Sequence, residues 1–374
     1  MKFNSDTEAA KSLVEFYENL KRETAKVIVG QEDVIDKLLI SLFTQNHALL
    51  IGVPGLAKTL LITTISQILG LSFNRIQFTP DLMPSDILGT EILDEHKNFH
   101  FIKGPIFANI ILADEINRTP PKTQSALLEA MQERSVSIAG NTLQLDRPFF
   151  VLATQNPIEQ EGTYPLPEAQ LDRFMFSIWL DYPTINEEIE IVKRTTFVDM
   201  PTVNNIIDKE TLLEYQKLVR KISVPDHVYE FAVQITAKTR PVYADCHPMA
   251  KEYVAWGGGP RSSQFMILGA KCHALLNGKY APDNEDVKAV ADSVFRHRLV
   301  LNYRAEAEGI NTIDIIHEII KDIEKNNFKK FAADFAHVYN AAWAGHGGQK
   351  EISTEQVLLM FKKMKPVICL LYTS

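Results

Sequence analysis

The chain opens with two stretches in which apolar residues recur at the spacing of one helix face. Asp6 or Thr7 is placed to cap the first helix, which we expect to end near Val27, and the second helix follows Gly30 and Gln31. The apolar face of the first is formed by Leu13, Phe16 and Leu20, and that of the second by Val34, Ile35, Leu38, Leu39 and Leu42. Both stretches predict amphipathic helices that pack on a core.

Short apolar runs then alternate with helical segments up to about residue 200. Strands that alternate with helices indicate a parallel sheet covered by helices on both faces. We therefore expect an α/β domain with a parallel five-stranded sheet. The candidate strands are 47–51, 73–78, 110–113, 149–154 and 175–180, and the helices between them include 58–69, 122–133 and 186–198.

Two segments interrupt this alternation, and a third ends it. Residues 86–107 and 135–145 have the alternating character of inserted hairpins, the second around Ala139-Gly140-Asn141. Residues 200–205 include a proline and form a plausible linker, after which strand signals vanish. The helices expected there are 211–221, 225–239, 261–277, 284–298 and 312–325, which predicts a small all-α second domain.

Composition narrows the class of protein. The 374 residues suggest two domains, and 39 basic against 47 acidic residues give a net charge of −8, a poor electrostatic match to nucleic acid or anionic lipid. None of the three cysteines forms a Cys-x-x-Cys pair, and no apolar run is long enough to span a membrane. We expect a cytoplasmic protein in a reducing compartment, without membrane insertion.

A candidate phosphate-binding loop follows the first strand. Gly52-Val53-Pro54-Gly55-Leu56-Ala57-Lys58-Thr59 matches Gly-x4-Gly-Lys-Ser/Thr except at Ala57, whose methyl group replaces the second glycine. Glycines let backbone N–H groups curl around phosphate oxygens, and the helix that starts here directs its positive end at them. Lys58 would bridge the β- and γ-phosphates and Thr59 would ligate Mg²⁺. The alternative is an ordinary strand-to-helix turn with a surface lysine.

Two acids end the third candidate strand. A strand beside the phosphate loop would deliver Asp114 to the Mg²⁺ shell and Glu115 to the water that attacks the phosphate. An Asp-Glu pair after a strand is also a common helix cap, and only its combination with the phosphate loop favours the catalytic interpretation.

Three further polar residues have two interpretations each. Asn156, in Gln155-Asn156-Pro157, follows a strand as a sensor of the γ-phosphate would, but Asn-Pro also favours turns. Arg173 is either a surface ion-pair partner or an arginine finger that reaches the nucleotide of a neighbouring subunit. Arg261, after Gly257-Gly258-Gly259, is either held at a hinge-like helix start or simply solvated.

Together these residues resemble the MoxR family of AAA+ ATPases, in a clade shared with magnesium-chelatase motors. The resemblance runs from about Val27 to Lys325. Its motifs are the segment Val29-Gly30-Gln31, the phosphate loop with Ala57, the segment 113–118, the first sensor segment 153–164, the arginine-finger box 166–174, Gly259-Pro260-Arg261 and the two hairpins.

The resemblance implies an AAA+ P-loop core at 1–200, a helical lid at 201–325 and an extension of unknown role at 326–374. It implies that Val29 and Gly30 lie by the adenine, that Leu60 belongs with the loop that binds ATP and Mg²⁺, and that Asn156, Arg173 and Arg261 act on the nucleotide. It further implies a ring, usually of six subunits, that hydrolyses ATP for chaperone-like remodelling with a von Willebrand factor A-type partner.

Two alternatives to this function stay open. One is a metal-insertion motor of the magnesium-chelatase type, and the other is a scaffold that binds ATP without useful turnover. A DNA translocase fits the acidic balance poorly. The last six residues, Cys369–Ser374, resemble the translation of a sequencing adaptor, and the sequence alone leaves open whether they are natural or foreign to the protein.

Overall fold

The computed structural model describes residues 3, 5–93, 99–138, 140–158, 162–196, 201–343 and 352–371. At its centre lies the predicted parallel sheet, in the order β2-β5-β8-β1-β9. Each strand is within a residue or so of its predicted position, because short apolar runs bounded by turns mark buried strands clearly. The strands are β1 (Ala48–Gly52), β2 (Phe73–Gln77), β5 (Ile110–Asp114), β8 (Phe150–Gln155) and β9 (Phe176–Leu180).

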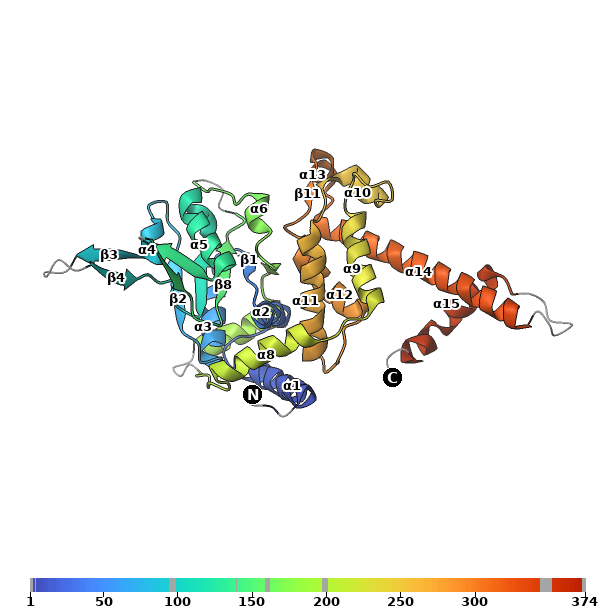
Figure 1. Cartoon of the computed structure of the whole chain (residues 1–374), viewed down its shortest axis with the longest axis horizontal. Helices are drawn as coiled ribbons and strands as arrows, with labels where there is room; N and C mark the ends of the chain where they lie inside the picture. Colours follow the sequence, from blue (N-terminus) through green and yellow to red (C-terminus); the bar gives the residue numbers. More distant parts are fainter. Residues whose placement is uncertain are drawn as a thin grey trace.

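Helices surround this sheet (Figure 1), and the first of them corrects one prediction. The cap of α1 is Ser5, whose hydroxyl accepts the amide of Glu8 at 3.1 Å, rather than Asp6 or Thr7. The helices of this part are α1 (Asp6–Thr24), α2 (Glu32–Phe43), α3 (Lys58–Ile68), α4 (Pro84–Leu88), α5 (Pro121–Glu133), α6 (Glu168–Leu171) and α7 (Ile185–Thr195).

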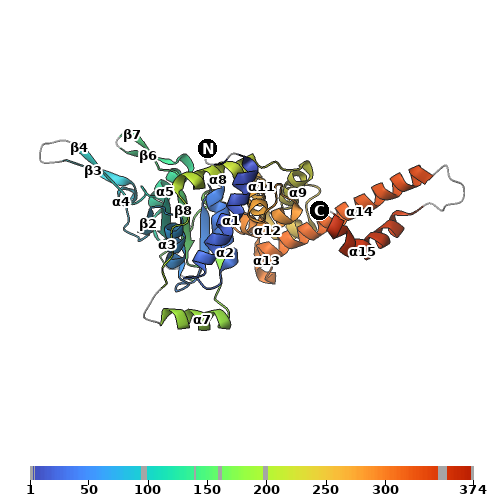
Figure 2. The same cartoon turned by 90° about the horizontal axis from the view of Figure 1, so that it is seen from below.

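Both inserted hairpins are present. β3 (Gly89–Leu93) pairs with β4 (Phe99–Lys103), and β6 (Ser135–Ile138) pairs with β7 (Asn141–Gln144), each antiparallel. The β3–β4 hairpin projects away from the sheet (Figures 1 and 2). Its base requires glycine at 89, where φ is +107° and a Cβ would lie 2.2 Å from the carbonyl oxygen of Ile102. Ala139, which belongs to the predicted turn of the second hairpin, lies outside the described residues.

Among the described residues, the second half of the chain is helical, as predicted, with one exception. The three-residue strand β10 (Val254–Trp256) pairs with β11 (Val300–Leu301), and neither is long enough to leave an alternating pattern in the sequence. The other elements are α8 (Lys209–Lys221), α9 (Asp226–Lys238), α10 (Pro248–Tyr253), α11 (Pro260–Leu276), α12 (Asn284–Phe295) and α13 (Tyr303–Glu308).

The lid helices pack directly on the sheet domain. On α11, a Cβ at Gly269 would lie 3.2 Å from the ring of Phe176 on the edge strand β9 and 3.2 Å from Val290 on α12. One hydrophobic core therefore runs from the sheet into the lid. Of the expected linker, residue 200 lies outside the described residues.

A single helix, α14 (Thr312–Trp343), continues well past residue 325, where the expected helix 312–325 was to end. No glycine or proline lies between residues 312 and 343, so nothing in the backbone ends the helix at 325. α15 (Thr354–Leu371) folds back on α14, with the ring of Phe361 5.8 Å from Phe328 and 5.4 Å from Phe335. This pair of helices extends away from the body (Figures 1 and 2).

Of the last six residues of the chain, 372–374 lie outside the described residues. Within the described ranges, no helix combines the length and the apolar character needed to cross a bilayer.

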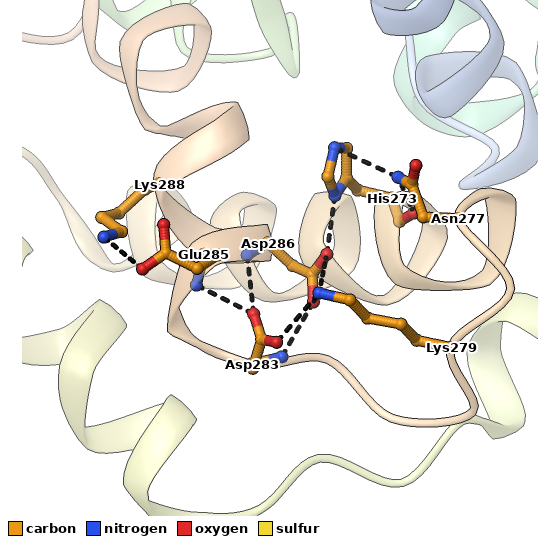
Figure 3. Close-up of polar contacts among 7 residues, drawn as sticks. All are labelled: His273, Asn277, Lys279, Asp283, Glu285, Asp286 and Lys288. Atoms are coloured by element: carbon orange, nitrogen blue, oxygen red, sulfur yellow. Dashed lines mark hydrogen bonds and ion pairs between the residues drawn. The ribbon is translucent and has the colours of Figure 1, made fainter. Parts of the chain in front are cut away.

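A charged cluster fixes the loop between α11 and α12 (Figure 3). The Asp286 carboxylate is fully buried and lies 2.7 Å from His273 Nδ1 and 3.2 Å from Lys279 Nζ. Asp283 caps α12 by accepting the amides of Glu285 and Asp286 at 2.9 and 3.1 Å, and it also accepts Lys279 Nζ at 2.9 Å. The lid loop is thus held by ionic contacts as well as by packing.

The cluster shifts two pKa values. Partial burial raises the pKa of Asp283, but the Lys279 ammonium and the contacts with Asp286 outweigh it and bring the pKa below its usual 3.8. Burial likewise lowers the pKa of Lys279, whereas Asp283 and Asp286 raise it above its usual 10.5. The two charged forms therefore stabilise each other in the folded chain.

We predict that Asp283→Ala lowers the free energy of unfolding by about 1–2 kcal/mol at neutral pH, because α12 loses its cap. The depressed pKa means that the carboxylate contributes fully above 3.8 and that this contribution is lost as pH falls through the folded pKa. Urea unfolding should show a difference from wild type that is constant down to about pH 4 and shrinks below it.

The matched control is Glu285→Ala, whose side chain is 73% exposed, and we expect it to cost less than about 0.5 kcal/mol. An Asp283→Ala effect that stays at full size at the lowest pH would contradict the ionic contribution.

Candidate nucleotide-binding site

The phosphate loop connects the end of β1 to the start of α3. Gly55 has φ +87° and Ala57 has φ +53°, so the chain turns through the left-handed region at both positions. For alanine this conformation costs about 1–2 kcal/mol, which explains why glycine is usual at position 57. The Lys58 ammonium donates to the carbonyl oxygen of Gly52, back across the loop. Thr59 is half-buried in the first turn of α3.

A largely apolar cavity of about 410 Å³ adjoins this loop. Its walls come from the segment before α2, from the phosphate loop and from α7, which lies apart from the body in Figure 2. An apolar slot next to a phosphate loop suits a flat base attached to phosphates. Of the expected residues, it is lined by Val29, Pro54, Gly55, Leu56, Ala57 and Leu60.

The other expected loop residues lie beside that wall. Gly30, with φ +67°, turns the chain next to α7, where a Cβ would clash with the Glu187 carboxylate. Gly52 is the last residue of β1, and Val53 follows it half-buried.

Asp114 ends β5 with both carboxylate oxygens engaged. Thr154 Oγ1 donates to Oδ1 at 2.6 Å, and the Arg75 guanidinium contacts Oδ2 at 2.6 Å. These contacts fix the position of the carboxylate at the edge of the sheet where the phosphate loop lies.

Glu115 occupies a strained backbone position, since its φ is +57°. Its amide donates to Thr154 Oγ1 at 2.9 Å. Its carboxylate accepts Gln77 Nε2 at 2.9 Å and Arg118 Nη1 at 3.0 Å. Left-handed non-glycine residues persist where the surrounding structure dictates them, and they cluster at functional sites.

Sheet order corrects one expectation about the acids. β5 is not beside β1, because β8 lies between them. Leu50 is in register with Thr154, and Ala113 with Ala153, so the carboxyl ends of all three strands still meet at one edge. The acids and the phosphate loop are therefore neighbours across an intervening strand.

The electrostatics agree with this placement. Burial is the largest influence on Lys58 and lowers its pKa below the usual 10.5, while the negative charges of Asp114 and Glu115 act in the opposite direction. The carboxylates thus lie close enough to stabilise the Lys58 ammonium.

Asn156 follows β8 directly at the same edge of the sheet. Its Oδ1 accepts the amide of Ile158 at 3.1 Å, which is the turn geometry that Asn-Pro favours. The turn and the sensor position are therefore compatible.

Arg173 is not part of the cavity. Its Nη1 donates to the carbonyl oxygen of Leu128 on α5 at 2.8 Å, in a separate hollow that also contains Glu129, Glu133 and Gln170. A single chain therefore does not bring Arg173 together with the phosphate loop.

Arg261 starts α11 on the lid side and forms an ion pair with Asp172 at 3.2 Å. Two of the three glycines before it are closely packed. A Cβ at Gly257 would lie 2.5 Å from the Thr239 carbonyl oxygen, and one at Gly258 would lie 2.8 Å from Phe295. Close packing, more than freedom to hinge, explains glycine at these two positions.

Sequence reasoning missed four residues that orient the acids: Arg75, Gln77, Arg118 and Thr154. Arg75 and Gln77 lie on β2, whose Gln77 is in register with Asp114. The polar residues Arg75 and Gln77 within an otherwise strand-like segment were the available signal, but only the strand order shows which acids they meet.

Comparison with known proteins identifies this architecture. Residues 47–176 match the ATPase family associated with various cellular activities (AAA), and residues 247–319 match the AAA lid domain. The chain is 44% identical over 302 residues to Chaperone MoxR1 of Mycobacterium tuberculosis, with 80% of each chain covered. It belongs to the MoxR family of AAA+ ATPases.

Two further comparisons agree. Protein MoxR of Methylorubrum extorquens is 28% identical over 321 residues, covering 81% of this chain and 93% of its own. The crystal structure of a putative ATPase from Cytophaga hutchinsonii is 44% identical with a TM-score of 0.79, covering 84% of this chain and 96% of its own. The MoxR resemblance and the AAA+ fold with a helical lid are confirmed.

We predict that Thr154→Val impairs ATP turnover without unfolding this MoxR-family chain. Valine keeps the shape of the fully buried Thr154 but leaves the Glu115 amide without its acceptor, which costs about 1–3 kcal/mol. Phosphate release should fall at least about tenfold if Glu115 loses its strained position.

Thr154→Ser is the matched control, because it retains the hydroxyl and should retain most of the activity. Equal turnover by the valine and serine variants would contradict the role of the hydroxyl.

Proposed function

We propose that this chain is a Mg²⁺-dependent ATPase that hydrolyses ATP to ADP and phosphate. The observation that carries the proposal is the meeting of an apolar cavity, a phosphate loop with Lys58, and the acids Asp114 and Glu115 at one edge of the sheet. The membership in an ATPase family supports it. A scaffold that only binds ATP would not need Glu115 beside the phosphate loop in addition to Lys58 and Asp114.

Each residue has a role that its chemistry suits. The cavity wall from Val29 to Leu60 holds the adenine, and the backbone of the loop 52–59 binds the phosphates. Thr59 and Asp114 offer the hard oxygen ligands that Mg²⁺ prefers, and the bound cation would neutralise phosphate charge. Lys58 adds a fixed positive charge at the same place.

Glu115 acts on the attacking water and Asn156 on the γ-phosphate. Glu115, held by Gln77 and Arg118, is the general base that polarises it. Asn156 senses the γ-phosphate with a neutral amide, and Arg261 approaches the nucleotide from the lid.

Arg173 serves a neighbouring subunit as an arginine finger. Two observations support this role. Arg173 lies in a hollow apart from the cavity, so it does not serve the nucleotide of its own chain, and that hollow is polar and open, so a neighbouring subunit can reach it. Hydrolysis then requires assembly into a ring, for which we propose six subunits.

The cellular role that we propose is chaperone-like remodelling of protein complexes in the cytoplasm, with a von Willebrand factor A-type partner. It rests on similarity to a relative named Chaperone MoxR1.

We further propose functional units at 1–200 for the core, 201–325 for the lid and 326–374 for the extension. Relatives cover about 80% of the chain.

A mixing experiment tests the proposed ring. We predict that Arg173→Ala binds ATP and that Lys58→Ala does not, and that neither alone turns ATP over. In a mixture, an Arg173→Ala subunit has an intact phosphate loop and receives the finger of a Lys58→Ala neighbour. Phosphate release should therefore reappear on mixing.

Arg220→Ala, which removes an exposed arginine of α8, is the matched control and should hydrolyse ATP like the wild type. If the mixture is as inactive as its two components, Arg173 is not an arginine finger for a neighbouring subunit. Hydrolysis by Arg173→Ala alone would also contradict that role.

A further inference from the structure

Asp172 lies between two arginines of the lid. Its Oδ1 accepts Arg298 Nε at 2.8 Å, and its Oδ2 lies 3.2 Å from Arg261 Nη1. The same residue directly precedes Arg173. One carboxylate thus connects the turn of the proposed finger to the proposed lid arginine.

The contact between Asp172 and Arg298 is buried and would be costly to break. The Arg298 side chain is 2% exposed and also donates to the carbonyl oxygens of Asp172 and Met175, each at 3.1 Å, and of Phe174. Burial lowers the pKa of Arg298 to about 10, against the opposing effect of Asp172, so the guanidinium stays charged at neutral pH. Breaking this contact would leave a charge buried and unpaired.

The Arg261 contact is exchangeable. Its side chain is 46% exposed, and among the described residues Asp172 is its one ion-pair partner. Exposed pairs of this kind are worth up to about 1 kcal/mol. A polyphosphate offers a guanidinium more charge and better paired acceptors than one carboxylate does.

We propose that Asp172 is a positioning residue that competes with the terminal phosphate of ATP for Arg261. Arg298 fixes the carboxylate, and the carboxylate holds Arg261 at the sheet domain when no triphosphate is bound. ATP removes Arg261 from Asp172, whereas ADP, which lacks the terminal phosphate, leaves the pair intact. Asp172 thereby sets how strongly the site prefers a triphosphate over ADP. This inference rests on the proposed function.

A purely structural role for Asp172 makes a different prediction. If Asp172 only neutralised Arg298, its loss would lower stability and weaken both nucleotides alike. The ratio of the two affinities therefore separates the alternatives.

The test is calorimetric titration with the non-hydrolysable β,γ-imido analogue of ATP and with ADP, each with Mg²⁺. Asp172→Asn should raise the preference for the analogue over ADP about two- to fivefold, since the competing pair is worth up to about 1 kcal/mol. In an Arg261→Ala background the same substitution should leave the preference unchanged. Asp226→Asn, an exposed aspartate on α9, is the matched control.

Asp172→Asn leaves Arg298 buried without its carboxylate and can unfold the chain. In that case Asp172→Asn/Arg298→Met replaces it, because no buried charge then stays unpaired. An unchanged or reduced preference, or the same rise with Arg261→Ala, overturns the inference while the proposed ATPase stands. Failure of the wild type to bind either nucleotide overturns both.

Discussion

The parallel course of the five strands is the constraint on which the rest of the structure depends. Parallel strands present their carboxyl ends at one edge, so β1, β5 and β8 bring Lys58, Asp114 and Asn156 together although they are far apart in the chain. The Thr154 hydroxyl then joins two of these strands by contacting Asp114 and the Glu115 amide. The arrangement of the strands therefore determines where in the fold the functional side chains meet.

The sequence predicted the strands, the hairpins and the phosphate loop because each depends on local pattern. It did not predict strand order, because periodicity contains no information about which strands are neighbours. For that reason the insertion of β8 between β1 and β5, and the contact of Gln77 with Glu115, emerged only from the fold. The expected helix ended at Lys325, but no glycine or proline lies there to end it, and α14 continues to Trp343.

The two arginines whose roles the sequence left open lie in different surroundings. Arg173 faces α5, away from the cavity, whereas Arg261 reaches across from the lid to Asp172. Arg298 joins the lid to the turn that carries Arg173 through three backbone carbonyl groups. A movement of the lid would therefore act directly on that turn, which carries the arginine proposed to meet a neighbour.

The central claim is that Glu115, held in a strained position at the end of β5, activates the water that cleaves ATP. A single-turnover measurement with radiolabelled ATP on the assembled Glu115→Gln variant tests it most directly. Glutamine keeps the shape and the hydrogen bonds but cannot act as a base. The account predicts that ATP binds and is recovered intact, while the wild type converts it to ADP and phosphate. Conversion by the variant at the wild-type rate would contradict it.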